Sequence, residues 1–271
     1  MAKQGKIWLV GAGPGDPELL TLRAARLIAG AELIVHDGLV DPDILLLAPR
    51  SARLISVAKA RARHTMPQHE IDALLIRHAR AGRQVVRLKG GDPFIFGRGG
   101  EEVEAARAAG IPVEVVPGIS AANGAAAAAR IALTHRDAAS VVSFVAGQCK
   151  PVLSDAAGGV EGGLAEQDWA GLAGKGRTLV IYMGVATAGR IAEKLMADGL
   201  APDMPVAVIE NGARPAMRVL RGLLAGLPDL IEAERVVSPA LIVIGEVTAR
   251  ENAAVAAFAQ ETPARAATCE S

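Results

Sequence analysis

The chain has 271 residues, more than one domain usually holds, and 51% of them are hydrophobic, so each of two domains could bury a core. Basic and acidic residues balance at 29 each and aromatics make up only 3%, which disfavours nucleic-acid binding. No apolar run approaches the roughly 18 residues of a membrane helix, and the two cysteines, Cys149 and Cys269, fit no metal spacing. We therefore expect a cytoplasmic protein with no metal, no nucleic-acid partner and no membrane anchor.

Short apolar strands alternate with helices in the first half of the chain. Strands are predicted over residues 6–10, 32–36, 54–57, 85–88 and 113–116, and helices over residues 17–29, 68–81 and 99–109. Asp16 followed by Pro17 is typical of a helix N-cap with proline in the first turn. Strands that recur between helices predict an α/β fold with a largely parallel sheet.

The second half repeats this alternation after Pro117 and Gly118. Helices are predicted over residues 120–129 and 186–198, and strands over residues 141–146, 178–182, 206–210 and 240–244. We expect an N-terminal α/β domain at 1–117, a C-terminal α/β domain at 118–250 and a poorly ordered tail at 251–271. The Gly/Ala/Ser-rich residues 148–167 are predicted to form a surface loop.

A first glycine loop, Gly11-Ala12-Gly13-Pro14-Gly15-Asp16, lies between a predicted strand and a predicted helix. Dinucleotide-binding proteins place G-x-G-x-x-G there, but the third glycine position is Asp16 in this chain. Pro14 also lacks the N–H that could bind a phosphate, and an acidic residue at a helix start disfavours an anion. The loop therefore favours a neutral or cationic small molecule; the alternative is a tight turn without a ligand.

A second glycine loop, LKGGDPFIFGRGGEE, follows the strand at 85–88 and holds five glycines. Ligands bind outside the carboxyl ends of strands in open α/β sheets, so two such loops predict one shared pocket. The alternative for Gly90, Gly91 and Asp92 is a turn alone, and for Arg98 a surface charge. We expect Phe94 and Phe96 to pack as ordinary apolar side chains.

Several single residues have a functional and a structural interpretation. Ser120, after Pro117-Gly118, is a candidate ligand contact or a plain N-cap. Asp37 ends a strand and could be a turn former or a general base. The segment 59–64, KARARH, is a solvated face or a basic arm for a polyanionic substrate. His135 has no second ligand at helical spacing, so we expect a structural histidine.

Taken together, these segments resemble a known family. They resemble, in the same order along the chain, segments of uroporphyrinogen-III C-methyltransferases. These segments are VGAGPGDPELLT, VHDGLV, RLKGGDPFIFGRGGEE, VPGISAA, LTHRD, YMG, MPVAVIENG and SPALIVIGEV. The resemblance implies two α/β domains of the tetrapyrrole methylase type with the active site in the cleft between them, a homodimer, and S-adenosyl-L-methionine as methyl donor. Two methyl groups would pass to ring carbons of uroporphyrinogen III, giving precorrin-2 via precorrin-1 for sirohaem and cobalamin synthesis.

The resemblance also implies roles for individual residues. Asp37 matches a proton acceptor and Lys59 a proton donor. The positions that match methyl-donor contacts are Pro14, Gly90, Gly91, Asp92, Ile95, Ser120, Ala121, Met183 and Gly212. The candidates that would meet the substrate's carboxylates are Arg61, Arg63, Arg98 and Arg136.

The chain departs from the family pattern on the substrate side. This chain has His36-Asp37-Gly38 where many members have Tyr-Asp-Arg, and Ala58-Lys59-Ala60 where they have Gly-Lys-Arg.

The alternative functions are those of a later precorrin methylase or an RNA methyltransferase of the same fold, an NAD(P)-dependent dehydrogenase, or a non-catalytic binding module.

Overall fold

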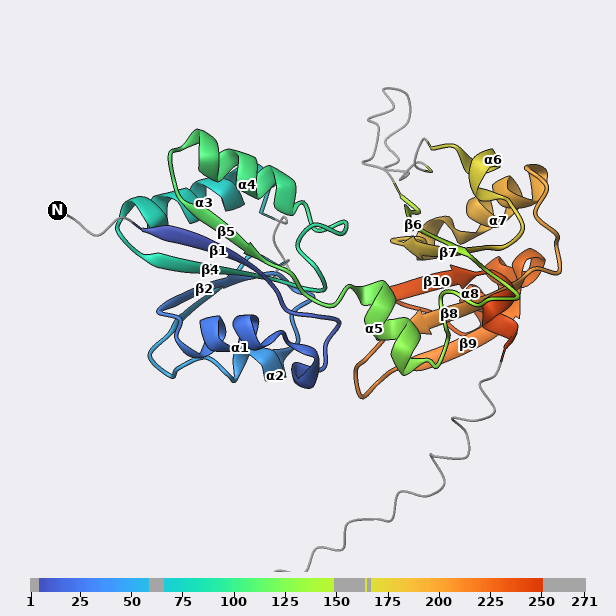
Figure 1. Ribbon diagram of the computed structural model, residues 1–271, viewed down its shortest axis with the longest axis horizontal. Coiled ribbons are helices and arrows are strands. Elements are labelled where there is room, and N and C mark those ends of the chain that lie inside the picture. The colour runs from blue at the N-terminus through green and yellow to red at the C-terminus, as the bar shows by residue number, and fades with distance from the viewer. Residues whose placement is uncertain (1–4, 59–65, 149–163, 165–166, 251–271) are drawn as a thin grey trace, which may run out of the picture.

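Two α/β domains lie side by side in a computed structural model that describes residues 5–58, 66–148, 164 and 167–250 (Figure 1). Each domain has one five-stranded sheet with helices on both faces. The chain passes from the first sheet to the second between the last strand of the first and a helix at residues 121–128. The predicted tail at 251–271 and most of the predicted loop at 148–167 lie outside the described residues.

The first sheet is parallel throughout. Its strands are β1 (Lys6–Gly11), β2 (Leu33–His36), β3 (Arg53–Ser56), β4 (Gln84–Lys89) and β5 (Val113–Val116). Their order is β3-β2-β4-β1-β5, which differs from the 3-2-1-4-5-6 order of dinucleotide-binding folds. Because all five strands run the same way, the loops after β1, β2, β4 and β5 emerge at one edge.

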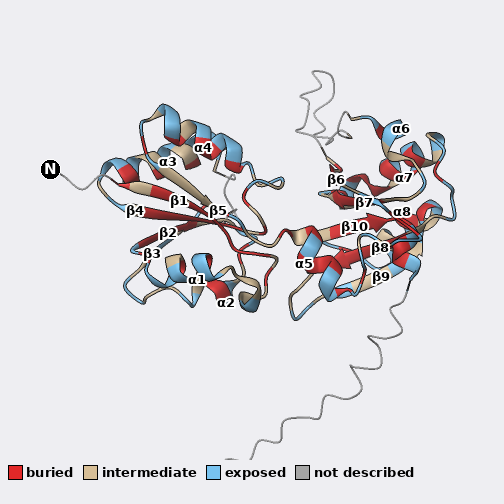
Figure 2. Cartoon of the chain, in the orientation of Figure 1, coloured by how far each residue is buried: buried red, intermediate tan, exposed pale blue. Residues whose placement is uncertain are grey.

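Helices cover both faces of this sheet, as Figure 2 shows by the buried strands between partly exposed helices. The helices are α1 (Leu22–Ala29), α2 (Pro42–Leu45), α3 (Gln68–Arg80) and α4 (Gly99–Ala108). Val86 and Leu88 of β4 pack with α1 and α2, whereas Val85 packs with α3 and α4. The side chains of β4 therefore alternate between two cores, as a strand buried on both faces requires.

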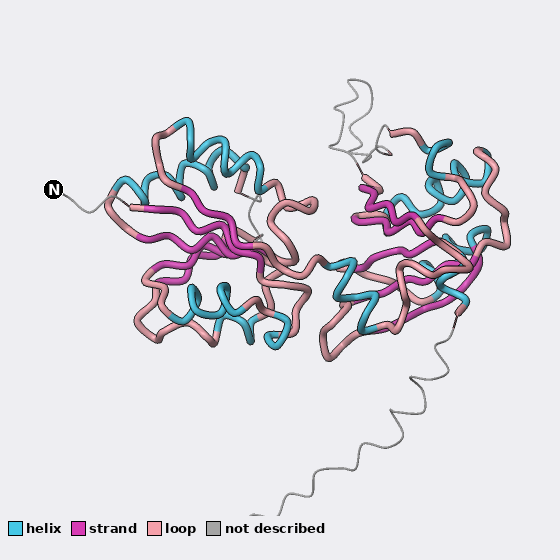
Figure 3. Tube along the Cα trace, in the orientation of Figure 1, coloured by secondary structure: helices cyan, strands magenta, loops and turns pink. Residues whose placement is uncertain are grey.

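The second sheet is mixed, so the prediction of a largely parallel sheet is correct for the first domain and wrong for the second. Its strands are β6 (Val141–Ala146), β7 (Arg177–Tyr182), β8 (Pro205–Glu210), β9 (Arg218–Leu223) and β10 (Ala240–Ile244). Only β6 and β7 pair in parallel within this sheet; the three other pairings are antiparallel. The unpredicted strand β9 follows β8 through a short turn, a connection that permits only antiparallel pairing (Figure 3).

Helices also cover both faces of the second sheet. They are α5 (Ala121–Ala128), α6 (Trp169–Leu172), α7 (Ala188–Ala197) and α8 (Leu227–Ala233). Leu179 and Ile181 of β7 pack with α6, α7 and α8, whereas Val180 packs with α5. No helix in the described ranges combines the length and apolar character needed to cross a bilayer.

The helix predicted over residues 17–29 is two helices in the structure. A 3-10 helix, η1 (Pro17–Leu19), precedes α1, because Leu20 is extended (φ −67°, ψ 142°) and Thr21 caps α1 through the Ala24 N–H. The predicted N-cap at Asp16 is confirmed: its side chain accepts a hydrogen bond from the Glu18 N–H at 2.8 Å. Further 3-10 helices are η2 (Val185–Thr187), η3 (Leu224–Gly226) and η4 (Glu246–Ala249).

Candidate functional site

The two glycine loops meet at the carboxyl edge of the first sheet. The Gly13 N–H donates to the Gly91 carbonyl at 3.1 Å, and the Gly91 N–H donates to the Gly13 carbonyl at 2.7 Å. Both residues have positive φ, +73° and +67°, which glycine adopts without strain. Because β1 and β4 are neighbours in the sheet, the loops that follow them are brought together, as predicted.

The segment after β5 joins these loops through Asp92. Its Oδ2 accepts a hydrogen bond from the Gly118 N–H at 3.1 Å, and its Oδ1 accepts one from the Phe94 N–H at 2.8 Å. Gly118 lies so close to the second loop that a Cβ there would be 2.3 Å from the Gly91 carbonyl oxygen. Asp92 thus joins the second loop to the segment after β5, while the Gly13–Gly91 bonds join the second loop to the first, and Asp92 also lines a cavity.

That cavity has a volume of about 760 Å³ and is lined by residues of both domains. It is lined by Leu19, Asp92, Ile95, Gly118, Ile119, Ser120, Asn123, Gly124, Ala127 and Phe144. Three of the predicted methyl-donor contacts, Asp92, Ile95 and Ser120, are among these residues. Ser120 is also the N-cap of α5, accepting from the Asn123 N–H at 3.2 Å, so its N-cap interpretation is confirmed and its contact with a methyl donor stays a prediction.

Other predicted methyl-donor contacts pack against α5. Pro14 lies on Gly124, where a Cβ would be 2.4 Å from the Pro14 Cγ, and Gly212 lies on Ala125 in the same way, at 2.3 Å. A Cβ on Gly91 would be 3.5 Å from the amide nitrogen of Ala121. Residues from distant parts of the sequence therefore assemble around the first turns of this helix.

Met183 joins this assembly through the residue before it. The Tyr182 hydroxyl accepts a hydrogen bond from the Ala122 N–H of α5 at 2.9 Å, and Met183, half exposed, follows directly. Burial raises the pKa of the Tyr182 phenol above its usual value. Phe96 of the first domain contacts the same tyrosine, with the two ring centroids 4.8 Å apart.

The expectation that Phe94 and Phe96 pack as ordinary apolar side chains is wrong. Their side chains are 55% and 42% exposed, which is unusual for phenylalanine. Phe96 also has a left-handed backbone, with φ of 51°. The loop turns these rings outward because Asp92 and the following glycines fix its path across the sheet edge rather than into the core.

Several left-handed non-glycine residues lie in the loops that follow strands β4, β7 and β8. They include Phe96 and Arg98 after β4, Met183 after β7, and Asn211 and Ala213 after β8, with φ between 49° and 58°. Each such residue costs on the order of 1–3 kcal/mol and persists only where its surroundings enforce it. This concentration of strain at one edge of each sheet is typical of a functional site.

Asp37, the predicted base, joins the β2 end to the second glycine loop. Its Oδ1 accepts from the Leu39 N–H at 2.9 Å, and its Oδ2 accepts from the Gly90 N–H at 3.3 Å. A Cβ on Gly90 would lie 2.7 Å from the Leu39 Cβ, so this contact requires glycine. The turn-forming role of Asp37 is therefore present in the structure; its role as base stays a prediction.

A buried charge cluster that the sequence analysis missed lies behind the second loop. Glu102 Oε1 is 3.0 Å from Arg87 Nε and 3.2 Å from Lys89 Nζ, and all three side chains are almost fully buried. Burial lowers the pKa of Lys89, and the positive charge of Arg87 lowers it further. The period of two along β4 could have placed Arg87 and Lys89 on one face, but nothing in the sequence pairs them with Glu102.

The predicted substrate-binding residues do not gather in the described structure. Lys59, Arg61 and Arg63 lie outside the described residues. Arg98 is exposed and donates to both carboxylate oxygens of Glu101, at 2.9 and 2.6 Å, an interaction that raises the pKa of Arg98. Arg136 is exposed in the loop before β6, at the opposite end of the β6–β7 pair from Met183.

His135 is structural, as expected, since its Nδ1 accepts a hydrogen bond from the Asp137 N–H at 3.1 Å. Within the part of the chain that the structure describes, no group of three or more His, Cys, Asp or Glu side chains could hold a metal ion.

Comparison with known proteins identifies the family. Residues 6–228 match the family described as Tetrapyrrole (Corrin/Porphyrin) Methylases. The chain belongs to this family. Its two α/β domains, with the cavity between them, are the fold of these methylases.

Two curated relatives and one solved structure illustrate the similarity. The chain is 52% identical over 243 residues to a siroheme synthase of Gluconacetobacter diazotrophicus and 54% identical over 245 residues to one of Tolumonas auensis, matching 90% of this chain in each case. The chain spans about half the length of these relatives (50%). The crystal structure of a uroporphyrin-III C-methyl transferase from Thermus thermophilus, complexed with S-adenyl homocysteine, superposes with a TM-score of 0.76 at 39% identity, covering 94% of this chain and 99% of that one.

Proposed function

We propose that this methylase transfers two methyl groups from S-adenosylmethionine to ring carbons of uroporphyrinogen III, giving precorrin-2 via precorrin-1 for sirohaem and cobalamin synthesis. The observation that carries the proposal is the cavity formed where the two glycine loops meet the first turn of α5. The similarity to an enzyme crystallised with S-adenyl homocysteine supports it.

The cavity suits the methyl donor. Its volume lies within the roughly 300–1,000 Å³ typical of small-molecule sites. Leu19, Ile95 and Phe144 offer apolar walls for a nucleoside, while Ser120 and Asn123 offer polar groups. The carboxylate of Asp92 favours a cation such as a sulfonium and disfavours a pyrophosphate. A dinucleotide cofactor is therefore a poor fit, in agreement with the strand order of the first sheet.

The donor supplies a methyl group attached to a good leaving group. The protein's contribution is therefore to orient the donor and the substrate towards each other and to remove a proton. Main-chain groups of Gly90, Gly91 and Asp92 would hold the donor without flexible side chains. Alignment of this kind can contribute roughly 7–11 kcal/mol. Alkylation leaves a positively charged tetrapyrrole whose methylated ring carbon bears no hydrogen, so a proton must leave from another position. Asp37 would accept that proton, a general-base effect of about 10²–10⁴-fold.

The substrate's carboxylates require cations, and we assign this role to Arg61, Arg63, Arg98 and Arg136. Lys59 would be a charge partner for the substrate in preference to a proton donor. Arg98 would have to exchange Glu101 for a substrate carboxylate, which an exposed pair permits at little cost.

The remaining features are proposed on the resemblance to the family. The protein would act in the cytoplasm as a homodimer, without a metal or a nucleic-acid partner.

We place the domain boundary at 117/118, because β5 ends the first sheet and α5 packs on the second.

Turnover of uroporphyrinogen III tests the proposal. The chain is incubated with uroporphyrinogen III and S-adenosylmethionine under reducing conditions, and the tetrapyrrole mass is measured. We expect a gain of one and then two methyl groups. Asp37→Asn should lower kcat by about 10²–10⁴-fold, a larger factor than any loss of affinity for S-adenosylhomocysteine through the weakened bond to Gly90.

Two results would contradict this account. Methyl transfer to an already methylated precorrin but not to uroporphyrinogen III would indicate a later enzyme of the same fold. Full kcat in folded Asp37→Asn would exclude Asp37 as the base.

A further inference from the structure

Arg214 lies in the turn between β8 and β9 of the second domain, yet it bonds to the first domain. Its Nη2 donates to the Leu39 carbonyl at 2.5 Å, and its Nε lies 3.8 Å from Asp41 Oδ2. The Arg214 side chain is only 19% exposed and that of Asp41 18%. Leu39 and Asp41 belong to the turn that connects β2 with α2.

The stem of Arg214 also lies against the first glycine loop. A Cβ on Gly15, where φ is +152°, would be 2.5 Å from Arg214 Cγ and 2.8 Å from its Nε. At the other end of the turn, Gly212 is packed on Ala125 of α5. The turn is thus fixed to the second domain at Gly212, while Arg214 extends over Gly15 to the first.

This contact continues to the predicted base. The Leu39 carbonyl accepts from Arg214, and the Leu39 N–H donates to Asp37 Oδ1 at 2.9 Å. The other carboxylate oxygen of Asp37 accepts from the Gly90 N–H. A chain of hydrogen bonds therefore runs from the β8–β9 turn through Leu39 and Asp37 to the second glycine loop.

We propose that Arg214 is a positioning residue that ties the β8–β9 turn of the second domain to the 37–41 turn of the first and thereby fixes Asp37 and Gly90. The effect of this tie on catalysis rests on the proposed function; the tie itself does not. Hydrogen bonds from a guanidinium are stronger than neutral ones, and the Arg214 side chain that donates this one is largely buried, although the Leu39 that accepts it is exposed. Asn211 and Ala213, just before Arg214, have left-handed backbone conformations, which are strained in non-glycine residues. This conformation of the turn directs the Arg214 side chain towards the first domain.

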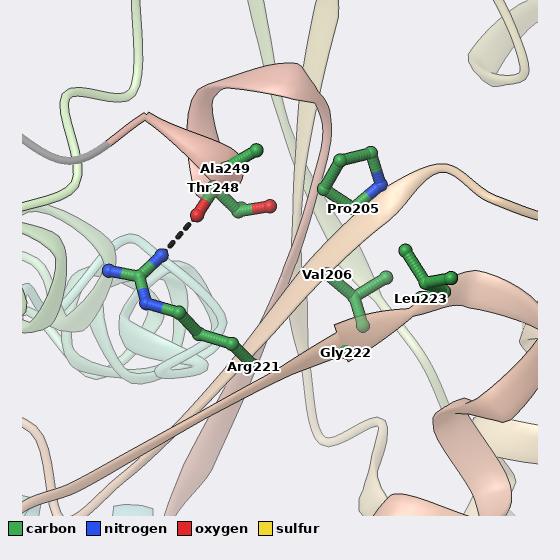
Figure 4. A pocket seen from close by; sticks show the side chains of 7 residues that line it. All are labelled: Pro205, Val206, Arg221, Gly222, Leu223, Thr248 and Ala249. Carbon is green, nitrogen blue, oxygen red and sulfur yellow. Dashed lines mark hydrogen bonds between the residues drawn. The ribbon is translucent and has the colours of Figure 1, made fainter.

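The same hairpin supplies a matched control in Arg221 of β9. Its guanidinium donates to the Thr248 carbonyl, beside a separate cavity lined by Pro205, Val206 and Leu223 among others (Figure 4). Every residue of this contact belongs to the second domain. Arg221→Met therefore removes one guanidinium–carbonyl hydrogen bond without changing any contact to the first domain.

Residue-resolved hydrogen exchange on the ligand-free full chain tests the tie. In Arg214→Met we expect the Leu39 and Gly90 amides to exchange roughly tenfold to a hundredfold faster, the factor expected for loss of a hydrogen bond to a charged group. Exchange at the core strand β7 should not change. At the Leu39 and Gly90 amides, Arg214→Lys should give an exchange rate between those of the wild type and Arg214→Met. Arg221→Met should exchange at these amides at the wild-type rate. Unchanged exchange at both amides in Arg214→Met would overturn the proposal, and Arg214→Lys answers the same question if the methionine variant does not fold.

Activity provides the second measurement. Arg214→Met should lower kcat by up to about 10²-fold, since small misplacements of catalytic groups have effects of this size, with little change in KM. If Arg214→Met speeds exchange at Leu39 and Gly90 but the wild-type chain does not methylate uroporphyrinogen III, the proposed function is refuted and the tie is supported. Wild-type turnover together with unchanged exchange in Arg214→Met would refute the tie alone.

Discussion

At the scale of single residues, the site depends on side chains that hold the backbone as well as on those that would touch a ligand. Asp37 and Asp92 each accept two backbone N–H bonds, and Tyr182 accepts one from α5. Tyr182 is the only tyrosine in the chain. It therefore gives a direct optical signal from the junction of the two domains.

The titration of Tyr182 is the first prediction. Because burial raises the pKa of its phenol, the ultraviolet absorbance of tyrosinate should develop above the pKa of about 10 of a free tyrosine. The unfolded chain provides the control and should titrate at the free value. A folded-state midpoint at or below that value would contradict the burial of the phenol.

The same shift affects stability at high pH. Above pH ~10 the folded state retains a proton that the unfolded state has lost, so this group makes the free energy of unfolding fall as pH rises towards the folded-state pKa. Tyr182→Phe should lack this part of the decline. Identical pH dependence of unfolding in the two proteins, measured by urea denaturation, would show that Tyr182 is not perturbed.

The sequence could identify several of these residues but not what they bond to. Asp37, Asp92 and Ser120 were predicted as site residues from their places after strands. The bonds of Asp37 to Gly90 and of Asp92 to Gly118 depend on where separate segments lie in space, which no local pattern encodes. The bond of Ser120 to Asn123 is local, and the N-cap interpretation of Ser120 predicts it. Phe96 was missed as a site residue because its outward orientation follows from the path of the whole loop.

At the scale of elements, β4 and α4 form a buried electrostatic unit beneath the second glycine loop. Arg87 and Lys89 share Glu102 Oε1, and Gln68 of α3 donates to the same oxygen at 3.3 Å. Glu102 Oε2 has no hydrogen-bond partner among the described residues. The cluster therefore anchors the end of β4, where the loop begins, at the cost of one unsatisfied atom.

Removal of the Glu102 charge should be strongly destabilising. Glu102→Gln leaves two buried cations without a counter-charge, and we expect the free energy of unfolding to fall by about 3–5 kcal/mol. Glu101→Gln is the matched control, since Glu101 is exposed and pairs with Arg98 on the surface, where about 0–1 kcal/mol is expected. Equal losses in the two variants, measured by urea denaturation, would refute a special role for the buried cluster.

Most elements could be predicted from hydrophobic periodicity, and the exceptions have physical reasons. The strands β5, β6 and β10 lie where they are predicted, because each is a short run rich in β-branched and other apolar residues, interrupted by one polar residue in β5 (Glu114) and one in β6 (Ser143). The helices α2 and α6 are single turns, too short to show a helical period. Strand β9 carries Arg218, Arg221 and Gly222 on a partly exposed edge, so its apolar signal is weak.

At the scale of the whole molecule, the site requires both domains. The cavity takes Leu19, Asp92 and Ile95 from the first and Ser120, Asn123 and Phe144 from the second. The order of motifs along the chain could predict that such a cavity exists, through the resemblance to the family. It could not predict the Arg214 contact, because that contact depends on the relative placement of two separate sheets.

A crystal structure of this chain with S-adenosylhomocysteine tests the central claim most directly. The account predicts that the ligand occupies the cavity lined by Asp92, Ile95 and Ser120, with the main chain of Gly90 and Gly91 against it. A ligand bound elsewhere, such as in the cavity beside Pro205 and Arg221, with no contact to the two glycine loops, would contradict it.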